Sequence, residues 1–262
     1  MKNKKKQVIL LSTHLLNERI ITGYRLIAEQ VDQKVFDIVL LYNTDQFDAR
    51  LMPSDIVCFQ SGSEDINQLG YIPIAETLSP GSCHFPVLRF YRLNPSYVYY
   101  WFVEYDVEFS GTWATLMNDC TCNLAEYDFL SCHIEKYSPA ANGDWPWWYK
   151  ENNSGFALDE CLKSFNPICR YSPQALNCID QFQRKGLSGH SEVTIPTCLY
   201  HHGMKLGDFG GTGKFTPLGY RNKYYVQGVG VNNGTMRWRP LFLEEEVRAL
   251  GTRNKLFHPV KE

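Results

Sequence analysis

Three carboxylates interrupt an aromatic run, YYWFVEYDVEFSG, that extends from Tyr99 to Gly111. Glu104, Asp106 and Glu108 alternate with other residues, so in an extended chain all three side chains point to one face. Burying unpaired charge in such a strand is expensive, and some partner must offset that cost. Two acids one residue apart can chelate a hard divalent cation, and the cation can bridge the phosphates of a nucleotide. The run therefore predicts a metal-assisted phosphate site.

The elements before this run predict a βαβ unit and hence a parallel sheet. Residues 7–14 (QVILLSTH) and 36–45 (FDIVLLYNTD) are apolar runs typical of buried strands. Between them, the apolar positions of residues 19–31 recur at helical spacing. Two strands joined through a helix must run parallel. Residues 54–60 predict a third strand, and residues 97–107 predict a fourth that ends at the acids.

The chain after Gly111 predicts further helices and strands. In chain order we expect a helix near 112–118, a strand over 127–137, helices over 172–186 and over 191–203 with Pro196 in its path, irregular structure or a short hairpin from 203 to 234, and a helix over 241–255. We find no internal repeat and no Pro/Ser-rich linker. The expected fold class is α/β, a single domain over residues 1–262 with a central, mainly parallel sheet flanked by helices.

Composition excludes several classes of protein. With 44% hydrophobic residues, the 262-residue chain can bury a large core, so disorder is not expected. The formal net charge of −2 provides no excess of positive charge that would attract a nucleic acid or an anionic membrane. The apolar stretch after the basic start is too short for a signal peptide or a transmembrane segment. We therefore expect a cytoplasmic protein without a nucleic-acid partner.

The nine cysteines favour reduced, buried thiols, because they lie among apolar neighbours without a CxxC pair. The alternative is a zinc site made from Cys120, Cys122, Cys132 and His133. The spacing of these four residues fits no standard structural zinc pattern.

Polar residues follow the predicted strands where a ligand should bind. In open α/β sheets, ligands bind beyond the carboxyl ends of the strands. Thr13, His14, Asn43, Asp45 and Asp106 all fall at such ends. We expect these side chains to line one ligand site.

These features together resemble a known family. A first strand ending in small polar residues, a central strand ending in acid-x-acid and a late His in a loop resemble the nucleotide-diphospho-sugar glycosyltransferases of the GT-A fold. More narrowly, WFVEYDVEFSGTW, GHSEVTIPT and LFHPVK are similar to a group of glycosyltransferase-like proteins. The resemblance follows the order of elements over most of the chain, although its specific motifs are short. It implies one Rossmann-like GT-A domain, a nucleotide-sugar donor and a glycan or small-molecule acceptor.

The resemblance also assigns metal and donor roles. It implies that Asp106 and Glu108 hold Mn²⁺ or Mg²⁺ against the donor diphosphate, with His258 as a third ligand. Glu108 stands where the commonest family pattern has Asp, so its longer arm could bind the metal, bind a sugar hydroxyl or leave the site metal-free. The alternative is that the acids are simply hydrogen-bonded to backbone and Arg. Lys261 could neutralise donor phosphates, as could Arg237 and Arg239; the alternative is that each is simply a surface charge.

A transferase that inverts the sugar needs a proton acceptor near the acceptor hydroxyl. Glu192 fits the resemblance best, with Asp208 as the second candidate. In the alternative interpretation, Ser191 caps a helix and Glu192 is a favourable acid in its first turn.

Three tryptophans in one Pro- and Gly-containing loop, Trp145, Trp147 and Trp148, predict an aromatic platform for an acceptor sugar. The alternative is a hydrophobic anchor without ligand contact.

The sequence thus predicts a glycosyltransferase. The alternative is a non-catalytic carbohydrate- or nucleotide-binding protein on the same fold. A nucleotidyltransferase is disfavoured because no G-x-G-x-x loop followed by Lys or Arg comes after the first strand. The absence of a Walker A motif disfavours a P-loop enzyme.

Overall fold

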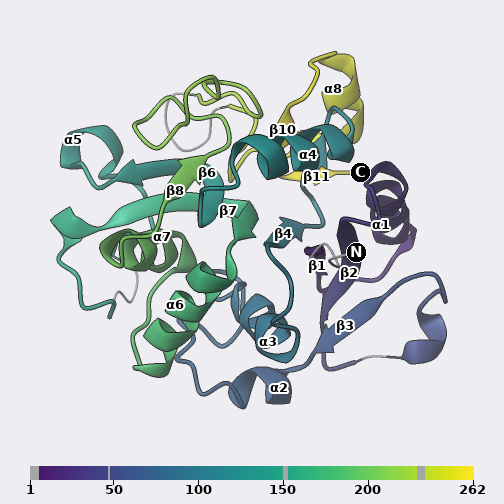
Figure 1. The fold of residues 1–262 in the computed structure, drawn as a ribbon, viewed down its shortest axis with the longest axis horizontal. Helices are drawn as coiled ribbons and strands as arrows, with labels where there is room; N and C mark the ends of the chain where they lie inside the picture. The colour runs from purple at the N-terminus through teal and green to yellow at the C-terminus, as the bar shows by residue number, and fades with distance from the viewer. Residues whose placement is uncertain (1–5, 47, 150–152, 229–233) are drawn as a thin grey trace, which may run out of the picture.

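A seven-stranded sheet with the order β3-β2-β1-β4-β7-β6-β8 forms the centre of the protein in the computed structural model (Figure 1). The structure describes residues 6–46, 48–149, 153–228 and 234–262. Parts of the aromatic loop (150–152) and of the glycine-rich region (229–233) therefore lie outside the described residues. The large sheet contains β1 (Gln7–Thr13), β2 (Phe36–Asn43), β3 (Cys58–Ser61), β4 (Tyr100–Glu104), β6 (Phe129–Lys136), β7 (Leu162–Tyr171) and β8 (Leu206–Asp208).

Most strand pairs in this sheet are parallel, which confirms the predicted α/β class. β3, β2, β1 and β4 pair in parallel, and β8 pairs in parallel with β6. Only β7 is antiparallel to its neighbours, β4 and β6. Every residue of β1 is buried, as expected for a central strand covered by helices on both faces.

The helices divide between the two faces of the sheet. They are α1 (Glu18–Gln30), α2 (Ser63–Asn67), α3 (Phe85–Leu93), α4 (Trp113–Asn123), α5 (Pro139–Asn142), α6 (Pro173–Arg184), α7 (Ser191–His201) and α8 (Glu244–Ala249), with 3₁₀ turns at Ala49–Leu51 and Leu158–Glu160. Ile9 and Leu11 of β1 pack in a core cluster with residues of α1 and α4, whereas Val8 and Leu10 pack with residues of α3 and α6. Within the described residues, no helix is both long and apolar enough to cross a lipid bilayer.

The predicted βαβ unit is present as β1, α1 and β2. Asn17 caps α1 by accepting a hydrogen bond from the Ile20 backbone N–H, and Ile20, Tyr24 and Ile27 are buried against the sheet. The predicted helices over 172–186 and 191–203 correspond to α6 and α7, and Pro196 lies inside α7.

The sequence analysis did not predict β7, α2 or α3. β7 carries Asn166 and Pro167 in its middle, and proline removes a donor from the ladder and normally argues against a central strand. The structure tolerates it because the pairing between β6 and β7 is irregular on both sides of Cys132.

The predicted fourth strand is shorter than expected, since β4 ends at Glu104. The chain then turns, with the Val107 N–H donating to the Glu104 carbonyl at 3.0 Å. Glu108 begins β5 (Glu108–Phe109), which pairs with β10 (Leu256–Phe257) in a separate two-stranded sheet. The three acids therefore do not share one strand face, which corrects the prediction.

The C-terminal segment returns to the end of β4. β11 (Val260–Lys261) pairs with β9 (Phe242–Leu243), and the Val260 N–H donates to the Asp106 carbonyl at 2.9 Å. This segment places His258 and Lys261 beside the acids.

Candidate active site

Two cavities meet at the carboxyl end of β4. The larger has a volume of about 710 Å³ and is lined by the ends of β1, β2 and β3, by α2 and by residues between 73 and 79. The smaller, about 230 Å³, lies between β4, β7, the start of α7 and the C-terminal segment. Glu104, Asp106, Ser79 and Cys83 line both cavities, so these residues form the wall between them.

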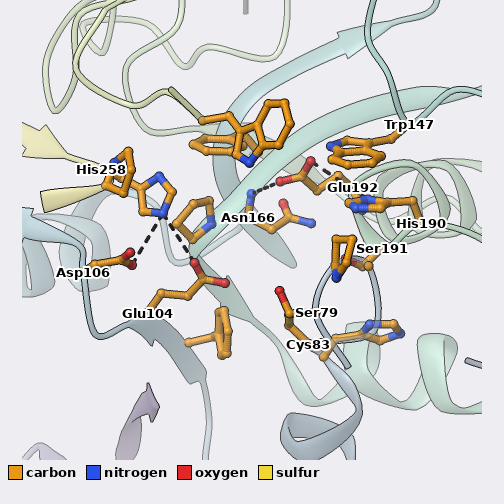
Figure 2. Close-up of a pocket in the computed structure, with 18 of the residues that line it drawn as sticks. Ser79, Cys83, Glu104, Asp106, Trp147, Asn166, His190, Ser191, Glu192 and His258 are labelled. Carbon is orange, nitrogen blue, oxygen red and sulfur yellow. Dashed lines mark hydrogen bonds and ion pairs between the residues drawn. The ribbon is translucent and has the colours of Figure 1, made fainter. Parts of the chain in front are cut away.

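His258, which lines the smaller cavity, brings a third potential ligand atom to Glu104 and Asp106 on this wall (Figure 2). The Nε2 atom of His258 lies 3.5 Å from Glu104 Oε2 and 3.5 Å from Asp106 Oδ1. His258 Nδ1 lies 2.9 Å from the carbonyl oxygen of Arg237, which can only accept, so Nδ1 carries a proton. This contact fixes the ring with Nε2 directed at the two carboxylates, the arrangement usual for a metal-binding histidine.

The residues fit a hard divalent cation. Asp106 Oδ1 is buried and has no hydrogen-bond partner among the described residues, so the fold leaves one carboxylate oxygen to be satisfied by a ligand. Neighbouring ligands of an octahedral Mn²⁺ or Mg²⁺ with bonds of about 2.1 Å are about 3.0 Å apart. The observed separations of 3.5 Å need only a small contraction to reach this spacing.

Hydrogen bonds from the C-terminal segment position Asp106. Lys261 Nζ donates to Asp106 Oδ2 at 2.7 Å and to the Tyr105 hydroxyl at 3.0 Å. The side chain predicted to neutralise donor phosphates thus lies next to the acids and lines the smaller cavity. Arg239 lines the same cavity, whereas Arg237 lines a separate pocket.

The structure does not bring Glu108 to the other two predicted ligands. Its carboxylate accepts from Arg19 Nη2 at 3.2 Å, and Arg19 also donates to Glu244 at 2.8 Å and to the Val260 carbonyl at 3.1 Å. Glu108 lines neither cavity. It belongs to a polar cluster that joins α1 to the C-terminal segment, and Glu104 takes its place beside Asp106.

The predicted strand-end residues lie together along the larger cavity. Thr13, His14, Asn43 and Asp45 all line it. Asp45 accepts hydrogen bonds from the backbone N–H and hydroxyl of Ser63, at the start of α2. Asn43 Oδ1 is buried without a partner among the described residues, so an acceptor is left for a polar ligand.

Glu192 faces the smaller cavity from the first turn of α7, across from the acids (Figure 2). Its Oε1 atom accepts from the Asn166 backbone N–H at 3.3 Å, and Oε2 is buried without a hydrogen-bond partner among the described residues. Burial raises the pKa of Glu192 to about 8, and the nearby charge of Glu104 acts in the same direction. His190, not Ser191, is the N-cap of α7.

Asp208, the second predicted proton acceptor, has a structural role. Its Oδ1 atom accepts from the N–H groups of Gly210 and Gly211 and from the Tyr225 hydroxyl, at 2.7–2.9 Å. Its Oδ2 atom accepts from the Ile134 N–H at 2.9 Å. Asp208 is buried and lines neither cavity, so the prediction is corrected: both oxygens are already occupied.

The three predicted sugar-binding tryptophans separate in the structure. Trp147 lines the smaller cavity, and its ring stacks on His190 at 4.4 Å (Figure 2). Trp148 is 1% exposed and donates from Nε1 to the Asn142 carbonyl, so it is a core residue and presents no face to a sugar. Trp145 is also buried, and Lys163 Nζ lies 4.7 Å from its ring.

The sequence analysis did not identify several residues that line the site. Trp238 lies edge-on to Trp147 at 5.7 Å, is 47% exposed and lines the smaller cavity. Asn166 enters the site from β7, which was itself not predicted. Their positions depend on long-range packing, and neither belongs to a local motif. The alternative zinc site is not formed: within the described residues, Cys120, Cys122, Cys132 and His133 do not come together as a group of ligands.

Comparison with known proteins gives similarity in structure only. No family model and no curated protein sequence matches the chain. The galactosyltransferase LgtC, in complex with donor and acceptor sugar analogs, matches with a TM-score of 0.48 and 7% identity over 95% of this chain and 79% of that chain. The mannosyltransferase Ktr4p from S. cerevisiae matches with a TM-score of 0.41 and 13% identity over 79% and 69%. Mouse xyloside xylosyltransferase 1, in its apo form, matches with a TM-score of 0.42 and 6% identity over 79% and 85%. Similarity at this level describes the course of the chain and assigns no activity.

Proposed function

We propose that the protein transfers a sugar from a nucleotide-diphospho-sugar donor to a glycan or small-molecule acceptor, with Mn²⁺ or Mg²⁺ bound by Glu104, Asp106 and His258. One observation carries the proposal. Glu104 and Asp106 lie on the wall shared by the two cavities, and His258 reaches both carboxylates from the smaller cavity, so a cation held by the three would link a diphosphate in one cavity to a sugar in the other.

The larger cavity suits the donor nucleotide. Its volume of about 710 Å³ falls within the range of about 300–1,000 Å³ usual for small-molecule sites. Thr13 and Asn43 offer polar groups along it. A bound cation supplies positive charge to the diphosphate as it leaves the sugar. Lys261 adds a second positive charge beside Asp106.

The smaller cavity suits the acceptor. Glu192 Oε2 is buried against this cavity without a hydrogen bond from the described residues, with His190 Nδ1 at 4.0 Å, and can take the proton of an acceptor hydroxyl. Trp147 and Trp238 offer aromatic surface at the same cavity, and sugars bind well on aromatic faces flanked by polar groups.

A specific observation favours the second candidate, a non-catalytic carbohydrate- or nucleotide-binding protein. With a pKa of about 8, the Glu192 carboxyl is mostly protonated at neutral pH and would donate a hydrogen bond to a sugar oxygen. Turnover requires the ionised form, which is the minor form at neutral pH unless bound substrate or metal lowers the pKa of Glu192. The two candidates therefore differ in whether Glu192 ionises in the loaded protein.

The experiment is a calorimetric titration with UDP, GDP and CMP, each with and without Mn²⁺. We expect one nucleotide to bind only with the metal, and Asp106→Asn and Glu104→Gln to remove that metal-dependent binding. Glu108→Gln is the matched control, since it neutralises an acid in the same segment that lines neither cavity. Metal-independent binding in the parent, or unchanged affinity in Asp106→Asn, would contradict the proposed ligand set.

A further inference from the structure

A second cluster of metal-binding side chains lies on α6 and α7, and it lines neither cavity. Cys178 comes from α6, Cys198 from α7, and His202 directly follows α7. The Sγ atoms of Cys178 and Cys198 are 3.7 Å apart, and Cys198 Sγ is 3.8 Å from His202 Nδ1. All three ligand atoms lie within 4.8 Å of one another.

The two separations that involve Cys198 Sγ, 3.7 Å and 3.8 Å, match the edges of a tetrahedral metal site. With metal–sulfur bonds of about 2.3 Å and a metal–nitrogen bond of about 2.05 Å, tetrahedral geometry places two sulfurs about 3.8 Å apart and a sulfur and a nitrogen about 3.6 Å apart. Two sulfurs joined in a disulfide would be only about 2.0 Å apart. The two sulfurs are therefore not joined in a disulfide, and their spacing is the one that coordination to a single ion requires.

We propose that Cys178, Cys198 and His202 bind one Zn²⁺, with a water molecule in the fourth position. Two thiolates and one imidazole are ligands that favour zinc, whereas Mg²⁺ and Mn²⁺ favour oxygen. The cluster would therefore select a different ion from the carboxylate site at Glu104 and Asp106.

Binding requires a defined change in protonation. Each thiol loses one proton to water, and the two thiolates balance the charge of the ion. In the absence of metal, His202 Nδ1 lies 2.8 Å from the Cys198 carbonyl and donates its proton there. On binding, the neutral ring carries its proton on Nε2 instead, so that Nδ1 can coordinate the ion. His202 is exposed and gives the ion a path from solvent, while both cysteines are buried.

The bound ion would fasten α7 to α6. The two helices already pack together, and Cys178 and Cys198 belong to one apolar cluster with Leu176 and Leu199. The first turn of α7 carries Glu192, so the site would stabilise the helix that holds this residue. The inference does not depend on glycosyl transfer.

Cobalt is the probe, because Co²⁺ replaces Zn²⁺ in such sites and its bonds to thiolates give a charge-transfer absorption. The full chain is stripped of metal with a chelator, kept reduced with a phosphine and titrated with Co²⁺. We expect one equivalent to produce a thiolate charge-transfer band that Zn²⁺ abolishes by displacement, and Zn²⁺ to raise Tm. The carboxylate site contains no sulfur and gives no such band, so the two sites are read separately.

Variants decide the assignment. Cys198→Ala and His202→Ala should each weaken Co²⁺ binding at least tenfold, whereas Cys122→Ala, which removes an exposed cysteine of α4, should bind like the parent. His202 is exposed, so its variant should fold even if a buried cysteine variant does not. No thiolate band in the parent, or an unchanged titration in His202→Ala, would overturn the proposal. So would reduced protein that takes up no Co²⁺ but forms a Cys178–Cys198 disulfide when oxidised.

Discussion

Replacing Glu192 by Gln tests whether the proposed site turns over. The amide keeps the shape of the side chain, and the substitution removes only its ability to take a proton. Donor and metal should bind nearly as in the parent, while sugar transfer should slow by roughly 10²–10⁴-fold, the usual contribution of a positioned proton acceptor. The fall should therefore appear in kcat without a matching rise in the donor KM.

The raised pKa of Glu192 sets the expected pH dependence. With a pKa of about 8, about 1% of the carboxyl is ionised at pH 6, about 9% at pH 7 and half at pH 8. The kcat/KM of the parent should rise roughly tenfold from pH 6 to 7 and roughly fivefold from pH 7 to 8. The charge of Glu104 is one cause of the raised pKa, so a cation bound there should move the rise to lower pH. The Gln variant should lack this rise.

The same substitution gives an independent reading on stability. The Glu192 pKa is about 8 in the folded protein, above the ordinary value of 4.5. Between these values the folded state holds a proton that the unfolded state has released. The free energy of unfolding therefore falls as pH rises, by about 1.4 kcal/mol per pH unit from this group alone. Glu192→Gln should remove that slope and raise Tm relative to the parent near pH 7.5.

Transfer is measured as nucleoside diphosphate release from the donor that binds in calorimetry, with an acceptor panel, across pH 5.5–9. Melting curves of parent and variant over the same pH range supply the stability reading. A Gln variant that transfers at the parent's rate, with the same pH profile, would refute the role of Glu192. Loss of transfer together with loss of donor binding would instead show that the substitution disturbed the cavity.

Three further predictions follow from the placement of the other candidates. Trp147→Ala should raise the activation free energy that kcat/KM gives for the acceptor by about 0.5–1.5 kcal/mol and leave donor affinity unchanged in calorimetry. Loss of donor affinity with acceptor use retained would instead place Trp147 over the nucleotide. Trp148→Ala should lower the free energy of unfolding by about 3–5 kcal/mol, because Trp148 is a core residue. Glu108→Gln should keep metal-dependent nucleotide binding. It should lower Tm only slightly, because Arg19 retains its hydrogen bonds to Glu244 and the Val260 carbonyl. Loss of the metal dependence would instead identify Glu108 as a metal ligand. Asp208→Asn should cost about 2–4 kcal/mol in denaturant unfolding, since an amide nitrogen would meet N–H donors; a stable variant with slow transfer would contradict its structural role.

The first half of the sheet was predictable because its signals are local. β1 and β2 are continuous apolar runs, and α1 has regular apolar spacing after a capping Asn17. Each pattern reports the burial of its own segment. β7 was not predictable in this way, because Asn166 and Pro167 break the strand pattern and only the irregular pairing with β6 accommodates them.

The proposed metal ligands show where the local pattern stops being informative. Alternation placed Glu104, Asp106 and Glu108 on one face only if the strand continued through all three residues. Instead, the chain turns after Glu104, and the carbonyl of Asp106 is held by the Val260 N–H. Asp106 and Glu104 therefore approach each other across a turn, while Glu108 begins a strand of another sheet.

The turn also explains why a residue of the C-terminal segment completes the group. If the strand had continued straight, its acids would have followed one another along the strand, and no residue distant in the chain would be needed to position them. Because β4 ends early, the acids lie where β10 and β11 return, and His258 between these strands reaches both carboxylates. His258 was expected only from the family resemblance. The structure adds a physical reason: the segment that holds Asp106 in place also carries His258, the third proposed ligand.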